Sequence, residues 1–354
     1  MKLPIVKDES YIHHKGQEFK HLPEVYQVEL TNACNLRCPM CLRTTDMLRD
    51  DQRLDLDLLR QMRARGDFAG SFYVELQMAG EPTLHPQLGE AVRILKEDVG
   101  VLTGLSTHGL LMQKAGVITA LLDLDALTIS VDSVEPETYH QMRYPARIEQ
   151  LYKNLELFFD CLRTHLALGR EAPFVELQLV ETSLAAGSGN VIALQEIMKA
   201  RGWEGLAEVR TTADCFGEMQ GRVEAGTTTR NAQICLNPFA SVSVAVNGDV
   251  LSCCFIFDPK KDEVNYYGNL REQSLAEIWT GPRVMEMRRQ HAREQLSGQC
   301  TKCYLKSPMQ IHLNIVSRLV RRRALARRRA MALISAKEDH GPQADPSVLD
   351  GECR

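Results

Sequence analysis

Residues 31–41 read TNACNLRCPMC, a stretch that places three cysteines, Cys34, Cys38 and Cys41, within eight residues. Three thiolates are one fewer than the four that close a structural zinc site or complete an iron–sulfur site. The spacing therefore predicts a metal centre with one open position. The alternative is one face of a helix, which the i, i+4, i+7 spacing also fits, but Pro39 argues against a continuous helix there.

The composition and charge of the chain exclude several classes of protein. The chain has 354 residues, with 42 basic and 46 acidic side chains and a net charge of −4, which excludes a wholly basic nucleic-acid-binding protein. No apolar run approaches the roughly eighteen residues of a membrane span. The start, MKLPIVKDESYIHHKG, lacks the apolar segment of a secretory signal. We expect a cytoplasmic protein whose 11 cysteines serve metal binding rather than disulfides.

Between about residues 25 and 213 short β-like runs alternate with longer helical patterns, as in successive βα units of a parallel sheet or barrel. The β-like runs are Tyr26–Leu30, Phe72–Gln77, Val101–Ser106, Ala126–Val131, Phe174–Val180 and Glu208–Thr212. The helical patterns are Leu54–Arg65, Gln87–Glu97, Lys114–Leu122, Ile148–Leu168 and Asn190–Ala200. Six units predict an incomplete α/β barrel, in which functional side chains follow the carboxyl ends of the strands.

After about residue 230 the pattern changes. Asn247-Gly248-Asp249 predicts the turn of a β-hairpin, and a helix is expected from Ser274 to about Arg293, ahead of Cys300. We therefore divide the chain into an N-terminal extension (1–24), the partial barrel (25–229), a small cysteine-rich hairpin and helix domain (230–305), and a basic helix with a disordered tail (306–354).

The cysteine triplet after the first strand resembles the hallmark of the radical S-adenosylmethionine (radical SAM) superfamily, and the resemblance extends over about residues 25–213. It implies a partial (β/α)6 TIM-like barrel. It also implies that Cys34, Cys38 and Cys41 bind three irons of a [4Fe–4S] cluster, while S-adenosylmethionine chelates the fourth. In that family a reductant such as flavodoxin or ferredoxin supplies the electron that cleaves S-adenosylmethionine. The resulting 5′-deoxyadenosyl radical abstracts a hydrogen from the substrate.

Three further loops carry the resemblance. Ala79-Gly80-Glu81-Pro82 is similar to the family's GGEP segment, so the resemblance assigns Gly80 and Glu81 to the methionyl ammonium. Ser106-Thr107-His108-Gly109 is similar to the ribose-binding S-x-N-G segment, with His108 in place of asparagine. Ser130 and Arg143 belong to a stretch that follows the fourth strand in many members. Arg143 either pairs with the cofactor carboxylate or forms an ordinary ion pair.

A second group of cysteines follows the barrel: Cys235, Cys253, Cys300 and Cys303. Their spacing alone also fits a four-cysteine zinc ribbon. In the radical SAM context it resembles the opening of a SPASM domain, and in particular the shortened "twitch" module of aminocyclitol dehydrogenases. That resemblance implies one auxiliary [4Fe–4S] cluster, fully ligated by cysteine, which accepts the electron left on a substrate radical.

Several residues are candidates for handling the substrate. Arg210 either stabilises a substrate oxygen or forms a buried pair with Glu176. Cys254, beside the presumed ligand Cys253, is an alternative ligand, a hydrogen-atom donor or an inert core thiol. Cys215 is a hydrogen-atom donor or an inert thiol.

The leading hypothesis is a radical SAM oxidoreductase acting on a sugar-like or aminocyclitol-like small molecule. The alternatives are a peptide-modifying maturase, a radical epimerase, and a non-catalytic metal-stabilised binding protein. Seven arginines between Arg318 and Arg329 suit a solvated helix or an anionic surface, and no nucleic-acid partner is expected.

Overall fold

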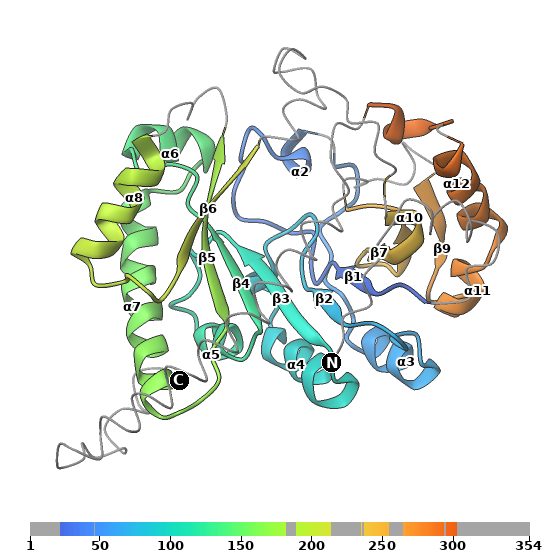
Figure 1. Cartoon of the computed structure of the whole chain (residues 1–354), viewed down its shortest axis with the longest axis horizontal. Coiled ribbons are helices and arrows are strands. Elements are labelled where there is room, and N and C mark those ends of the chain that lie inside the picture. Colours follow the sequence, from blue (N-terminus) through green and yellow to red (C-terminus); the bar gives the residue numbers. More distant parts are fainter. Residues whose placement is uncertain are drawn as a thin grey trace.

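The computed structural model describes residues 22–45, 47–181, 189–213, 235, 237–254, 265–293 and 295–302. Cys215, Cys303 and the arginine-rich segment lie outside the described residues. One nine-stranded sheet organises the described part, in the order β6-β5-β4-β3-β2-β1-β7-β8-β9 (Figure 1). The sheet is open, because β6 and β9 stand at its two ends.

The first six strands are all parallel to their neighbours. They are β1 (Val25–Val28), β2 (Tyr73–Glu75), β3 (Leu102–Thr107), β4 (Ala126–Ser130), β5 (Phe174–Glu181) and β6 (Glu208–Ala213). The helices between them are α2 (Leu42–Thr45), α3 (Asp57–Arg65), α4 (Leu88–Arg93), which continues as the π-helix η2 (Ile94–Val99), α5 (Val117–Leu122), α6 (Pro136–Met142), α7 (Ile148–Ala167) and α8 (Gly189–Ala200). The short 3-10 helix η1 (Pro82–Leu84) follows β2. This confirms the predicted partial (β/α)6 barrel; α2 and α6 are additions to it.

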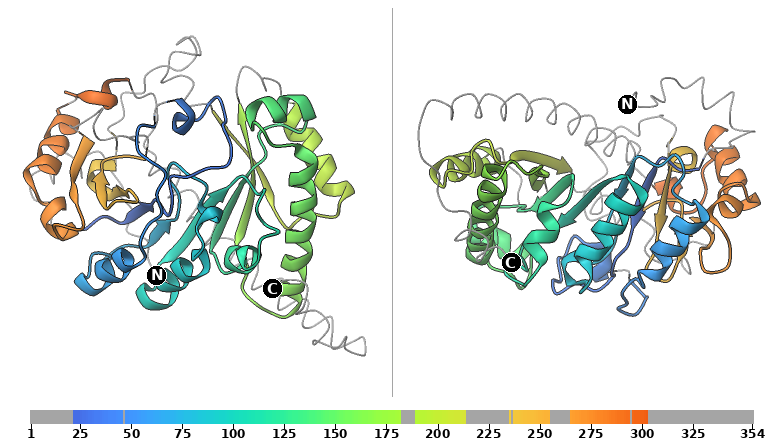
Figure 2. Two further views of the ribbon diagram at one scale, coloured as in Figure 1. Left: turned by 180° about the vertical axis from the view of Figure 1, so that it is seen from behind. Right: turned by 90° about the horizontal axis from the view of Figure 1, so that it is seen from below.

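The two faces of the curved sheet have opposite chemistry, because successive strand residues point to opposite sides. Val74, Leu105, Leu127 and Leu177 are at most 1% exposed and belong to the apolar core, with helices α3, α4, α5 and α7 along the outside (Figures 1 and 2). The opposite side of strands β2–β6 carries mostly polar side chains: Glu75, Ser106, Thr128, Glu176, Gln178 and Arg210. The inner face is therefore polar, whereas closed barrels fill theirs with branched apolar residues.

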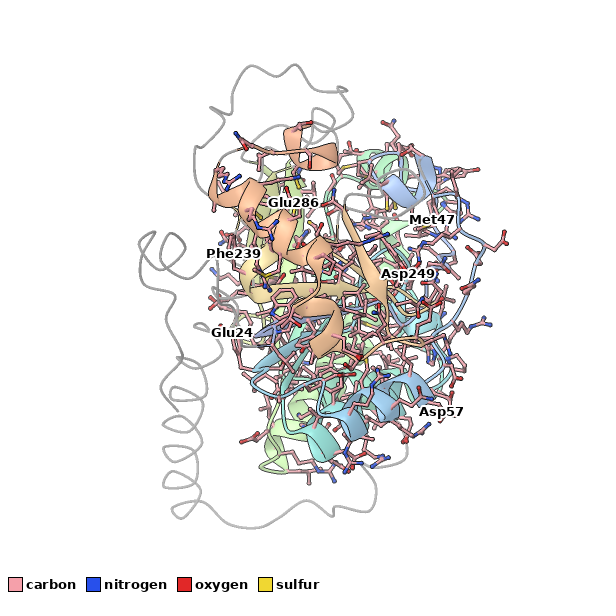
Figure 3. The ribbon with its side chains drawn as sticks, turned by 90° about the vertical axis from the view of Figure 1, so that its right-hand side faces the viewer. Glu24, Met47, Asp57, Phe239, Asp249 and Glu286 are labelled. Atoms are coloured by element: carbon pink, nitrogen blue, oxygen red, sulfur yellow. The ribbon has the colours of Figure 1, made fainter. Side chains whose placement is uncertain are left out.

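The cysteine-rich segment extends the same sheet. β7 (Ser241–Val244) pairs in parallel with β1, and β8 (Asp249–Leu251) and β9 (Tyr266–Asn269) add antiparallel strands. The backbone N–H of Glu24 donates to the carbonyl of Ala240, at the end of α10 (Asn237–Ala240), at 2.9 Å, so the lead into β1 lies beside α10 (Figure 3). Barrel and C-terminal segment thus share one continuous hydrogen-bonded sheet.

The predicted helix from Ser274 to Arg293 is wrong as a single element. The structure has α11 (Leu275–Trp279), then α12 (Pro282–Ala292) and the 3-10 helix η4 (Gly298–Lys302). Pro282 has no backbone N–H to continue a helix, but it suits the first position of a new one, which begins here after Gly281. Within the described residues no helix combines the length and the apolar character that a membrane crossing requires.

The stability of the fold should fall on acidification, partly because of His291 in α12. His291 is 4% exposed, and burial lowers its pKa to about 4. The unfolded chain takes up this proton near its ordinary pKa of ~6.5, so the stabilising contribution is present above that pH and is lost as the pH falls toward 4. We expect urea midpoints to fall from pH 7.5 to pH 5, and His291→Gln to reduce that fall. The same substitution at the partly exposed His165 should leave it unchanged.

Candidate functional site

The cysteine triplet lies on the loop that leaves β1, and α2 begins immediately after Cys41. Cys38 is 6% exposed, Cys34 and Cys41 are partly exposed, and all three are free thiols. Burial raises the pKa of Cys34 to about 11 and also raises the pKa of Cys38, although nearby Arg143 opposes the latter. Buried thiols of this kind become thiolates when a metal binds them, so the group fits a cationic metal centre.

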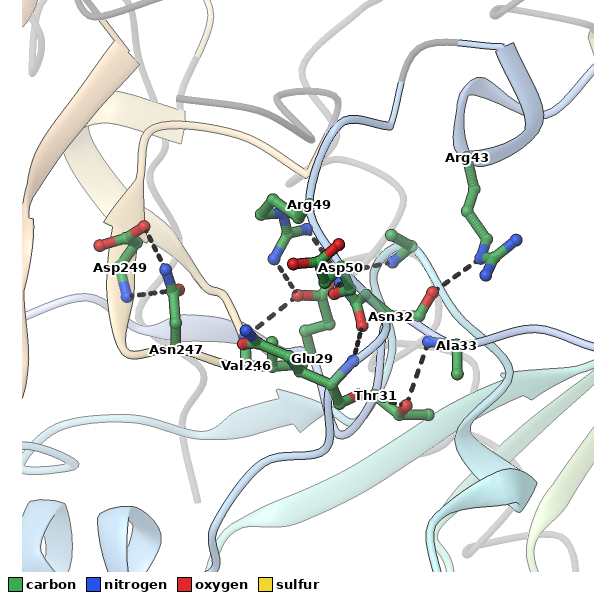
Figure 4. Close-up of polar contacts among 12 residues, drawn as sticks. Glu29, Thr31, Asn32, Ala33, Arg43, Arg49, Asp50, Val246, Asn247 and Asp249 are labelled. Carbon is green, nitrogen blue, oxygen red and sulfur yellow. Dashed lines mark hydrogen bonds and ion pairs between the residues drawn. The ribbon is translucent and has the colours of Figure 1, made fainter. Parts of the chain in front are cut away.

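Backbone contacts fix the entry to this loop. The buried side chain of Asn32 donates to the carbonyl of Asp50 at 2.8 Å and accepts from the backbone N–H of Gln52 at 2.6 Å (Figure 4). Arg43 of α2 donates to the carbonyl of Asn32 at 2.7 Å, and the Thr31 hydroxyl donates to the carbonyl of Gln52 at 2.6 Å. The loop that carries the cysteines therefore begins at a segment whose backbone is held in place by these contacts.

A fully buried carboxylate, Glu29, joins this segment to two other loops. The Arg49 guanidinium donates to both of its oxygens, at 2.7 and 2.9 Å (Figure 4). The same carboxylate accepts from the backbone N–H of Ala79 at 3.3 Å and of Val246 at 3.0 Å. Ala79 opens the Ala-Gly-Glu-Pro loop and Val246 stands in the β7–β8 turn. One side chain thus holds together the cysteine loop, the loop after β2 and the C-terminal segment.

Gly80 allows the loop after β2 to lie directly against the cysteine loop. A Cβ at this position would stand 2.2 Å from the carbonyl oxygen of Thr31 and 2.6 Å from that of Ala33. Both are backbone atoms, so they cannot move aside as a flexible side chain would. The glycine is required for this close approach, which brings two of the predicted cofactor loops together.

We expect Gly80→Ala to weaken S-adenosylmethionine binding by about tenfold or more, because the methyl group forces the two loops apart. Anaerobic calorimetry on the iron-reconstituted protein measures the affinity. Gly89→Ala is the matched control: its Cβ would meet only the Ala120 methyl, at 3.8 Å, and alanine favours the α4 helix. Equal affinity in both variants would show that the close approach does not shape the cofactor site.

Glu81 and His108 are both held by the protein itself. The Glu81 carboxylate accepts from the hydroxyls of Thr83 and Thr107, each at 2.6 Å, and from the backbone N–H groups of Thr83 and His108. The backbone N–H of Leu110 donates to His108 Nδ1, so the ring proton lies on Nε2, which is 2.8 Å from Asn35 Oδ1. Burial lowers the pKa of His108, which favours this neutral ring. Their assignment to the cofactor stays a prediction; the observed contacts lock three loops together.

Arg143 connects the loop after β4 to the cysteines. It forms an ion pair with Asp132, which is fully buried, and its Nη1 lies 3.8 Å from the sulfur of Cys38. Asp132 adopts a positive φ of 63°, and its backbone N–H donates to the carbonyl of Gln178 at 3.0 Å. The other Asp132 oxygen, Oδ1, is buried with no hydrogen-bond partner among the described residues. Such an orphaned acceptor beside the cysteine loop fits a site that binds a further polar group.

The polar inner face holds the predicted substrate residues. Arg210 Nη2 donates to Gln178 at 2.7 Å, and its Nε lies 3.7 Å from Glu176. Ser106 donates to Glu75 at 3.1 Å, a contact that places a predicted cofactor residue beside a carboxylate the sequence analysis missed. Glu75 could have been found from strand alternation, because it lies two residues after Tyr73 in β2 and so points to the same, inner face of the sheet.

The late cysteines gather in the C-terminal segment. Cys235 precedes α10, Cys253 and Cys254 follow β8, and Cys300 lies in η4; all four are partly exposed. Cys253 and Cys254 pack against a small apolar cluster that includes Leu42 and Ala79. This cluster includes a residue of α2 and a residue of the loop after β2, and the role of Cys254 stays open. Within the described residues no three His, Cys, Asp or Glu side chains could hold one metal ion; in an iron–sulfur cluster each cysteine binds its own iron.

Comparison with protein families gives two matches along the chain. Residues 28–169 match the radical SAM superfamily, and residues 235–304 match SPASM, an iron–sulfur cluster-binding domain. The chain belongs to the radical SAM superfamily. A [4Fe–4S] cluster, S-adenosylmethionine and further iron–sulfur binding come with these two domains. The radical SAM match contains the front cysteines, Gly80 and Arg143, and the SPASM match contains the four predicted auxiliary ligands.

Individual relatives are more distant. The radical SAM domain resembles GTP 3′,8-cyclase of Chlorobaculum tepidum, with 30% identity over 142 residues, which is 39% of this chain and 42% of that protein. The chain spans less than half of the length of the first curated relatives it matches. The fold resembles BtrN in complex with AdoMet and 2-DOIA (TM-score 0.50, 17% identity, 80% of this chain, 94% of that one). It also resembles Streptococcus suis SuiB bound to the precursor peptide SuiA (TM-score 0.56, 13% identity, 80% and 70%).

Proposed function

We propose that this chain is a radical SAM oxidoreductase that abstracts a hydrogen from a small polar substrate, of the sugar or aminocyclitol class, and uses one auxiliary [4Fe–4S] cluster as electron acceptor. The observation that carries the proposal is the contact of the cysteine loop with the loop after β2 at Gly80, beside the polar inner face. A small electron-transfer protein of the flavodoxin or ferredoxin class is the expected reductant.

The chain's own residues would perform defined tasks. Cys34, Cys38 and Cys41 would hold the front cluster, which supplies the electron for cleavage of S-adenosylmethionine. Arg143, held by Asp132, presents positive charge beside Cys38, and Gly80 brings the backbone of its loop against the cysteine loop. The buried loop contacts restrict the access of water to a reactive radical.

The inner face supports a polar substrate. Glu75 and Glu176 are 7% and 1% exposed, and Arg210, Gln178 and Ser106 lie on the same register. Carboxylates, a guanidinium and hydroxyls can orient the hydroxyl and amino groups of a polar substrate by hydrogen bonds, which an apolar substrate could not form. The fold likeness to BtrN, whose structure holds 2-DOIA, supports the same substrate class.

The deciding experiment is anaerobic purification and reconstitution, with counts of iron, sulfide and zinc and an assay of 5′-deoxyadenosine with dithionite and S-adenosylmethionine. About eight irons per chain and formation of 5′-deoxyadenosine are the expected result. Zinc at the late cysteines would remove the auxiliary oxidant. No 5′-deoxyadenosine from a protein with an intact front cluster would favour a non-catalytic binding protein.

A radical epimerase is a second candidate, because Cys254 is a free thiol packed against the apolar cluster that contains Ala79. A thiol hydrogen donor exchanges with water, so an epimerase would deliver deuterium from heavy water to the reacting carbon, and Cys254→Ser would abolish turnover. Oxidation instead yields a product without solvent deuterium at that carbon. A peptide substrate, suggested by the likeness of the fold to peptide-bound SuiB, is tested by the same isotope experiment on candidate peptides.

A further inference from the structure

Tyr267 of β9 carries a buried hydroxyl that no described residue satisfies. The residue is 5% exposed, and its hydroxyl has no hydrogen-bond partner among the described residues. A buried hydroxyl without a partner destabilises a protein, because it loses its hydrogen bonds to water and gains none. Native proteins rarely retain such a group unless something outside the chain, such as a bound ligand, accepts its hydrogen bond.

The residues near this hydroxyl indicate what could accept its hydrogen bond. Tyr267 packs in the main core, against which Cys300 also packs, and β9 pairs with β8, the strand that leads to Cys253. Burial raises the pKa of Tyr267 well above its ordinary value, and negative charge on Cys300, Cys235 and Cys253 raises it further. Three of the four predicted auxiliary ligands thus lie close enough to this phenol to raise its pKa.

Positive charge lies on the same side. Arg288 of α12 is fully buried over the ring of Trp279 and donates to the carbonyl of Pro238 at 2.8 Å. It interacts electrostatically with Tyr267, and burial lowers its pKa to about 10. A buried guanidinium and an orphaned phenol together favour a bound anion, and a [4Fe–4S] cluster with four thiolate ligands is anionic.

We propose that the Tyr267 hydroxyl donates a hydrogen bond to the auxiliary iron–sulfur cluster, at a cysteine sulfur or an inorganic sulfide, and thereby raises its reduction potential. The inference rests on the proposed function, because it assumes that the late cysteines hold such a cluster. The reduced cluster carries one more negative charge than the oxidised one and binds the donor more tightly, so the hydrogen bond favours reduction. Tyr267 is a positioning residue for the electron acceptor; it does not touch the substrate.

Tyr267→Phe removes only the hydroxyl. We expect the equilibrium constant for reduction of the auxiliary cluster to fall about tenfold, which is about 59 mV for a one-electron couple. A potentiometric titration of the reconstituted full chain, followed by electron paramagnetic resonance, measures it. S-adenosylmethionine alters the signal of the front cluster, so the auxiliary signal is the one that it leaves unchanged.

Tyr266→Phe is the matched control. Tyr266 is adjacent on β9, so it points to the opposite face. Its pKa is raised by burial and by Asp249 and Glu272, with no contribution from cysteine. Removal of the Tyr266 hydroxyl should leave the reduction potential of the auxiliary cluster unchanged. The iron-free Tyr267→Phe protein should be at least as stable as the parent, since the substitution deletes an unsatisfied hydroxyl, and this separates the effect from damage to the fold.

An unchanged auxiliary potential in Tyr267→Phe at full iron content would overturn the inference and leave the proposed function intact. An equal drop in Tyr266→Phe would also overturn it, because the effect would then not depend on the orphaned hydroxyl. If the parent protein binds only about four irons, all at the front cysteines, the proposed function and this inference fail together.

Discussion

Replacement of Cys34, Cys38 and Cys41 together by alanine should lower the iron content of the reconstituted chain from about eight to about four and abolish 5′-deoxyadenosine formation. The three thiols lie on one anchored loop and each would bind a separate iron, so their removal takes away all the predicted protein ligands of the front cluster. Iron analysis and quantitation of 5′-deoxyadenosine by chromatography measure both effects.

Cys353→Ala is the control for this variant, since it removes a thiol that belongs to neither predicted group. It should retain about eight irons and the parental rate. Continued cleavage of S-adenosylmethionine by the triple variant would contradict the site assignment. Loss of all iron from it would show that the auxiliary site depends on the front cluster.

Glu29→Gln should strongly destabilise the fold. The Glu29 side chain is fully buried, and its two oxygens accept hydrogen bonds from the two terminal nitrogens of Arg49, whose side chain is 12% exposed. Removal of one charge of a buried pair leaves the other unpaired, which typically costs about 3–5 kcal/mol of unfolding free energy. Anaerobic urea unfolding measures this loss. Hydrogen exchange should also show faster opening of the loop at Ala79 and of the turn at Val246, since both backbone N–H groups donate to this carboxylate.

Two comparisons sharpen this test. Glu90→Gln removes a carboxylate from an exposed ion-pair group with Arg60 and Arg93, and it should change stability little. The double variant Glu29→Leu with Arg49→Met should be less destabilised than Glu29→Gln, because it leaves no unpaired charge. If Glu29→Gln and Glu90→Gln behave alike, Glu29 does not join the loops energetically.

The local elements were accessible from the sequence, because they depend on short-range patterns. All six strands and five of the helices occur where the periodicity predicted them, with ends that differ by a few residues. The break between α11 and α12 was also visible in the sequence, since Gly281-Pro282 interrupts the helical pattern.

Contacts between distant segments were not accessible from the sequence. Glu29 and Val246 are separated by 217 positions, and nothing local to either residue indicates the other. The parallel pairing of β7 with β1, which unites the SPASM segment and the barrel in one sheet, also joins segments that lie far apart in the sequence. The orphaned hydroxyl of Tyr267 could not be predicted either, because burial and a missing partner exist only once α12, β9 and the late cysteines have packed together.

The sequence by itself determined the class of chemistry: the spacing of Cys34, Cys38, Cys41 and the later cysteines predicts which atoms bind iron, since ligand type and number are properties of the residues. Only the tertiary structure decided how that chemistry is arranged. It locked Glu81 and His108 into contacts between loops, placed Arg143 against Cys38 and made Glu29 a junction of three segments. The physical reason is that hydrogen bonds and charges act over a few ångströms in space, whatever their separation along the chain.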